Sequence, residues 1–166
     1  MTTKNSPTTE EPKPKKLIFE TYLQIVKNSP GSKLFRNLYI EGPDKKRQDA
    51  LFNGALSCAV FVSSILVIFH KIGRVHATVA STIKDLEESG WQIVKEPKPG
   101  DVIIWKKILI DGDWHEHMGF YVGDDKAVSN SWKKCVPVEH HYKFAPNQRG
   151  IDRILRFSDW SGSTEG

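Results

Sequence analysis

The sequence predicts an α+β domain, with helices in the first half of the chain and an antiparallel sheet in the second half. Up to residue 90 the apolar residues follow a helical period, and Gly73 and Gly90 stand where helices are expected to stop. After Trp91 the apolar residues fall in short runs separated by Gly, Asp and Pro, which is typical of strands. The 166 residues suffice for one domain with a sizeable core, and they contain no internal repeat.

The domain is expected to span residues 17–157. Residues 1–16 are rich in Thr, Pro, Lys and Glu, and are predicted to be a disordered N-terminal tail. Residues 158–166 are predicted to be a flexible C-terminal tail. Because the first sixteen residues lack the aliphatic run of a secretory signal, a cytoplasmic location is the default expectation, with release by lysis or a non-Sec route as the alternative.

The helical half is organised around one apolar helix. In order, the expected elements are an amphipathic helix over residues 17–27, a short element over 34–40, a helix over 58–72 and an amphipathic helix over 78–89. The third element is apolar nearly all round, so it is expected to be buried at the centre of the domain. Its apolar run is interrupted by Ser63 and Ser64 and is too short to span a membrane.

The second half is expected to form an antiparallel meander. The predicted strands cover residues 102–105 and 108–110, then 117–122, 126–131, 136–138 and 151–157. Side chains alternate along a strand, so His117 and Gly119 share one face. The glycine is expected to leave room for a helix to approach that face.

Cys58 stands at the start of the predicted central helix. There, backbone N–H groups and the helix dipole favour a thiolate. A lone cysteine in an apolar helix is usually plain core, so a catalytic role requires a base within reach. His70 lies twelve residues along the same helix, about 18 Å away at 1.5 Å per residue, and is excluded. His117 is the histidine that the pattern favours as the base.

Three motifs follow one another along the chain: Cys58 between small residues, Pro99-Gly100-Asp101 before a strand, and His117-Met118-Gly119-Phe120-Tyr121-Val122-Gly123. Over residues 53–131 they resemble the NlpC-like and CHAP-like branch of the papain-like cysteine peptidases and amidases. The resemblance implies a papain-like domain in which a central buried helix packs on an antiparallel sheet. It also implies a hydrolase that cleaves an amide or peptide bond through a thioester, with Cys58 as nucleophile and His117 as general base. A peptide or a peptidoglycan stem peptide is the implied substrate.

The chain departs from the family around the nucleophile, where Leu56-Ser57-Cys58-Ala59 replaces the common Asp-Cys-Ser-Gly. The residue that orients the histidine should come from the next strand. A two- or four-residue loop places Asn130 on the His117 face and an odd loop places Ser129 there. Asn130 is predicted, because its amide oxygen can accept from an imidazole N–H. Asn53 is the nearest counterpart of the family's side-chain oxyanion donor, beside the N–H of Cys58.

Other functions are left open or disfavoured. An acyltransferase that uses the same Cys–His pair and a non-catalytic binding domain on the same fold are the alternatives to a hydrolase. The net charge is +4 and the basic residues are scattered, so the pattern disfavours a nucleic-acid partner. No metal or cofactor is expected, since the spacing of Cys135, Glu139, His140 and His141 fits no familiar zinc site.

Overall fold

The computed structural model describes residues 14–110, 112–146 and 148–161, which form an α+β domain as predicted. The described helices are α1 (Ile18–Asn28), α2 (Cys58–Ile68) and α3 (Val79–Glu88). The strands are β1 (Tyr39–Glu41), β2 (Arg47–Asp49), β3 (Gln92–Val94), β4 (Val102–Ile110), β5 (Asp113–Gly123), β6 (Lys126–Ser131), β7 (Val136–His141) and β8 (Ile151–Arg156). None of the described helices has the length and apolar character needed to cross a membrane.

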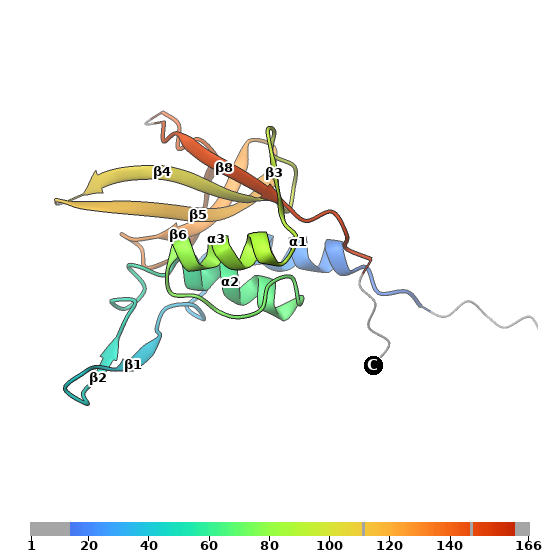
Figure 1. The fold of residues 1–166 in the computed structure, drawn as a ribbon. Helices are drawn as coiled ribbons and strands as arrows, with labels where there is room; N and C mark the ends of the chain where they lie inside the picture. Colours follow the sequence, from blue (N-terminus) through green and yellow to red (C-terminus); the bar gives the residue numbers. More distant parts are fainter. Residues whose placement is uncertain (1–13, 111, 147, 162–166) are drawn as a thin grey trace, which may run out of the picture.

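Six strands form one antiparallel sheet in the order β3-β8-β4-β5-β6-β7. The helices lie on one side of this sheet, and the small β1–β2 hairpin extends away from the sheet and the helices (Figure 1). Strand β4 joins the two predicted pieces into one strand with a register shift between Trp105 and Ile108. Strands β1, β2 and β3 were not among the predicted strands.

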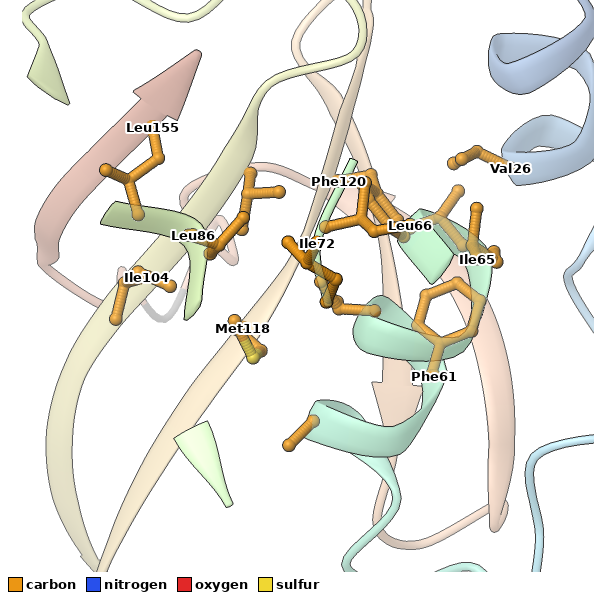
Figure 2. Close-up of a cluster of buried hydrophobic side chains, with 14 of the residues drawn as sticks. Val26, Phe61, Ile65, Leu66, Ile72, Leu86, Ile104, Met118, Phe120 and Leu155 are labelled. Atoms are coloured by element: carbon orange, nitrogen blue, oxygen red, sulfur yellow. The ribbon is translucent and has the colours of Figure 1, made fainter. Parts of the chain in front are cut away.

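Helix α2 lies at the centre of the core, as its apolar sequence predicts. Phe61, Ile65 and Leu66 have no exposed surface, and Figure 2 shows them close to Phe120 of β5. The helix ends earlier than predicted, because His70 adopts a left-handed backbone conformation at φ 54° directly after the C-terminal cap. The chain therefore leaves the helix before Gly73.

The predicted turn before β4 ties three parts of the domain together. Gly100 has φ +94°, and an added Cβ there would lie 2.7 Å from the Phe19 ring, so the turn requires glycine. Its N–H donates to Tyr121 O at 2.8 Å. The buried carboxylate of Asp101 accepts two hydrogen bonds from Arg156 of β8, at 2.9 and 2.7 Å. These contacts fix the start of β4 between β5 and β8.

The predicted C-terminal tail is wrong for residues 158–161. The Trp160 ring stacks on Tyr22 of α1 with centroids 4.4 Å apart, and Lys71 donates to Asp159 O at 3.2 Å. An aromatic side chain buries enough apolar surface to hold such a segment on the domain. Residues 1–13 and 162–166, which belong to the predicted tails, lie outside the described residues.

Candidate active site

A cavity of about 750 Å³ opens where the N-terminus of α2 meets β5 and β6. Cys58, His117, Ser129, His140 and Arg149 all line it. The structure therefore brings the predicted nucleophile and the predicted base to one pocket. Among the further polar residues that line it, Ser129 is the one that the sequence offered as an alternative partner for the histidine.

Cys58 is the first residue of α2, as predicted. Burial raises the pKa of its thiol, while N–H groups of Met118, Ala59 and Cys58 itself, together with the Arg149 charge, act in the opposite direction. The net shift is upward, so the prediction of a resting thiolate is wrong. The bond from Met118 is nonetheless informative, because this residue follows His117 on β5 and brings the sulfur to that strand.

His117 lies on the face of the sheet opposite the helical core. Its ring stacks on Trp105 of β4, with centroids 5.3 Å apart, and lies 5.9 Å from the Phe144 ring. Its neighbour Met118 points into the core instead. The expectation that Gly119 makes room for a helix is wrong: an added Cβ would lie 2.6 Å from Ser129 Cβ, so the glycine admits strand β6.

Ser129, and not Asn130, is the partner of the histidine. His117 Nε2 and Ser129 Oγ are 2.8 Å apart. The β5–β6 loop has two residues, which in a regular hairpin would pair Gly119 with Asn130. A β-bulge between Tyr121 and Gly123 adds one residue to β5, and the register becomes Gly119 opposite Ser129. The bulge turns Asn130 to the other face, so the prediction that its amide orients His117 is wrong.

Asn130 has a different position in the site. Its Nδ2 donates to Gly54 O at 2.8 Å and so ties β6 to the segment that precedes α2. Its Oδ1 is buried and has no hydrogen-bond partner within the described part of the chain. Asn53 lies outside the pocket with an exposed side chain, while its backbone N–H bonds Asp49 at 2.8 Å. The expected oxyanion role of Asn53 is thus not supported by its position.

The hydrogen bonding continues from Ser129 to a second histidine. Ser129 Oγ lies 2.7 Å from His140 Nε2, and His140 Nδ1 lies 2.9 Å from His141 O. Phe144 covers the His140 ring, with centroids 4.1 Å apart. The sequence had offered His140 both as one of six candidate bases and as part of a disfavoured zinc site, and the described residues hold no group of three His, Cys, Asp or Glu side chains suited to a metal ion.

The surroundings keep the His117 ring uncharged. Burial, then the Arg149 charge and then His140 lower the pKa of His117 from 6.5 to about 3. The lone pair of a neutral imidazole is available to accept a proton at neutral pH. The resting pair therefore consists of a thiol and a neutral imidazole, not of a thiolate and an imidazolium.

Arg149 is the cation that acts on Cys58 and His117, although Lys133 also lines the pocket. Its Nε donates to Lys106 O at 2.9 Å and its Nη2 to His115 O at 2.6 Å, which holds the guanidinium at the register shift of β4. Its charge favours the thiolate of Cys58 and disfavours the imidazolium of His117. No sequence signal pointed to Arg149, because it stands in a loop outside every motif.

Two tryptophans form the rim of the pocket. Trp114 and Trp132 line the cavity, although their exposed fractions are 67% and 50%. Exposed aromatic rings beside a concave site are suited to packing against an apolar or planar part of a ligand.

No known protein family model matches the chain, and no curated protein is significantly similar to it in sequence.

Proposed function

We propose that the protein is a cysteine-dependent hydrolase of the papain-like type, which cleaves an amide or peptide bond through a thioester. The observation that carries the proposal is that Cys58 and His117 line the same pocket, with the His117 ring held by Ser129 through Nε2. That bond leaves Nδ1 as the nitrogen that serves the thiol. A nucleophile, a base and a group that orients the base are the parts that acyl transfer requires.

In the proposed reaction, Nδ1 of His117 takes the thiol proton as the sulfur of Cys58 bonds to the substrate carbonyl carbon. The resulting oxyanion is stabilised by the N–H of Cys58 at the helix start and by the Arg149 charge. The imidazolium then gives its proton to the amine nitrogen as the C–N bond breaks, leaving a thioester. Water then attacks the thioester carbon while His117 takes one water proton, the C–S bond breaks as the carboxylic acid is released, and His117 returns its proton to the departing sulfur.

The neutral resting pair suits this order of events. Arg149 stabilises negative charge on the sulfur and opposes positive charge on the imidazole. An ion pair of thiolate and imidazolium is therefore not the resting state. The proton moves to His117 only as the sulfur bonds to the carbonyl carbon and its negative charge passes to the carbonyl oxygen. We propose a peptide-like substrate, with a peptidoglycan stem peptide as the first candidate because of the family resemblance. Trp114 and Trp132 on the rim are placed to pack against its flanking groups.

A non-catalytic binding domain is the second candidate, and the upward shift of the Cys58 pKa favours it. In that case the same pocket binds a peptide-like ligand and leaves it intact. The two candidates differ in the fate of the ligand, so they can be separated directly.

The test incubates the protein with stem peptides and a panel of peptide amides, and measures newly released amine together with binding. The hydrolase proposal expects release that Cys58→Ala abolishes and Cys135→Ala retains; Cys135 is the matched control because it is the only other cysteine of the chain. Binding without release, or release that survives Cys58→Ala, contradicts the hydrolase.

A further inference from the structure

Hydrogen bonds run from His117 through Ser129 to His140 and on to the His141 carbonyl. The carbonyl decides which atom donates in each of them. His140 Nδ1 lies 2.9 Å from the backbone carbonyl oxygen of His141. A carbonyl oxygen only accepts, so Nδ1 of His140 carries the proton. In the neutral ring the other nitrogen, Nε2, then has no proton and can accept a hydrogen bond through its lone pair.

The direction passes through Ser129. Its Oγ lies 2.7 Å from His140 Nε2, which as a lone pair must accept the hydroxyl proton. With its one proton donated to His140, Ser129 Oγ can only accept from His117 Nε2, at 2.8 Å. His117 is therefore the tautomer with its proton on Nε2, and its Nδ1 is the free lone pair.

We propose that His140 is a positioning residue that sets the tautomer of His117, acting through the Ser129 hydroxyl, so that Nδ1 is kept as the basic nitrogen. The proposal rests on the proposed function only for the use made of that nitrogen. The tautomer itself follows from the geometry.

The serine explains why a second histidine is needed. An asparagine or carboxylate oxygen next to an imidazole can only accept and so fixes the tautomer alone, whereas a hydroxyl can donate or accept. Without His140, Ser129 could donate to Nε2 and leave the proton of His117 on Nδ1, which abolishes the base. His140 removes this ambiguity.

The environment of His140 keeps its ring neutral. Phe144 stacks on its ring at 4.1 Å and Trp105 lies 5.7 Å away. Burial lowers the pKa of His140, and the charge of His141 also lowers it, while its bond to the His141 carbonyl and the charge of Glu139 raise it. The net shift is downward, so the ring is neutral at pH 7.

The experiment reads the tautomers by NMR of the full chain with ¹⁵N-labelled histidine at pH 7. The wild-type protein is expected to show His117 protonated on Nε2 and His140 protonated on Nδ1. His140→Leu is expected to move part of the His117 population to the Nδ1 proton. Acylation of Cys58 by p-nitrophenyl acetate should slow about tenfold, a fraction of what a general base contributes. His140→Gln should restore both readouts, because its amide oxygen accepts from Ser129.

The matched control is His141→Leu, which removes the adjacent imidazole but keeps the backbone carbonyl that His140 needs. It should leave the His117 tautomer and the acylation rate unchanged. A wild-type His117 protonated on Nδ1 overturns the proposal, and this measurement needs no variant to fold. A His140→Leu protein that acylates normally with an unchanged tautomer also overturns it, while leaving the hydrolase intact. The expected tautomers in a protein whose Cys58 is never acylated uphold the inference and reject the hydrolase.

Discussion

The protein holds two histidines by side-chain hydrogen bonds in different ways, and the contrast separates a structural brace from a base. His76 Nε2 lies 2.7 Å from the carboxylate of Asp85 on α3. That carboxylate also accepts from the N–H groups of Gly73 and Arg74 and from Ser89 Oγ. Although burial raises the pKa of Asp85, these bonds lower it to about 2. The cluster ties α3 to the segment that follows α2, and His76 does not line the pocket.

His117 is held by a hydroxyl and a second histidine, with a cation nearby. Its ring has no carboxylate partner to stabilise an imidazolium, and its pKa falls to about 3. The Asp85 carboxylate joins His76 to a cluster that braces two segments, whereas burial and the Arg149 charge keep the His117 ring neutral, with a lone pair on one nitrogen. The two sites thus differ both in the partner of the ring and in the surroundings that act on it.

The largest expected effect comes from exchanging the two histidines for alanine. His117→Ala should slow acylation of Cys58 by p-nitrophenyl acetate roughly 10²- to 10⁴-fold, the usual contribution of a general base. His76→Ala should leave that rate within about twofold, since His76 lies outside the pocket. Stopped-flow release of p-nitrophenol measures both. Equal losses in the two variants contradict the distinction between base and brace.

The free energy of unfolding should depend on pH partly through His117. Its folded pKa of about 3 lies below the ordinary 6.5, so the unfolded chain binds more protons between these values. Stability is therefore fully present above pH 6.5 and is lost as pH falls towards 3, by roughly 3–5 kcal/mol at the lower end. The lowered pKa of Asp85 acts in a lower window, below its ordinary 3.8.

Urea unfolding at a series of pH values between 7 and 4 measures this loss. His117→Gln should flatten the slope in that range, while His70→Gln, at an exposed position, should keep it. An unchanged slope in His117→Gln contradicts a neutral His117 in the folded protein.

The brace should contribute to stability rather than to chemistry. His76→Ala removes one partner of the Asp85 carboxylate, and Asp85→Ala leaves the ring and three other donors without their acceptor. These bonds are exposed or only partly buried, but their acceptor is charged, and a hydrogen bond to a charged group contributes roughly 1.5–3 kcal/mol. We expect Asp85→Ala to lower the urea midpoint more than His76→Ala does. The reverse order would contradict the role of Asp85 as the shared acceptor of the cluster.

The smallest effect is expected from replacing Arg149. Arg149 lowers the pKa of both Cys58 and His117, so Arg149→Met should raise both. The pH profile of acylation should shift to higher pH, and the rate at pH 7 should fall about tenfold. Arg149→Lys keeps the charge and should shift the profile less. A profile that stays in place in Arg149→Met means that the guanidinium does not act on the pair.

Regular patterns made much of the fold predictable. The apolar period placed α2 at the centre of the core, and alternation with turn residues placed β4, β5 and β6. The same patterns placed Cys58 at a helix start and His117 on a strand. Both residues belong to long, regular elements whose side-chain directions follow from the backbone period.

Irregular features were not predictable. The bulge between Tyr121 and Gly123 places Ser129 instead of Asn130 on the face of His117. No residue type in this part of the sequence predicts a bulge. Arg149 reaches the pocket from a loop, and Trp160 packs on Tyr22 from a segment that is polar around it. Long-range packing decides such details, while the sequence pattern reports only local periodicity.

Whether His117 activates Cys58 can be tested by intact-mass and peptide-mapping spectrometry after brief exposure of the protein to p-nitrophenyl acetate at pH 7. We predict one acetyl group per chain, attached to Cys58, present in Cys135→Ala and absent from both Cys58→Ala and His117→Ala. An acetyl group on Cys135 with Cys58 unmodified, or equal acetylation of Cys58 in wild type and His117→Ala, would contradict it.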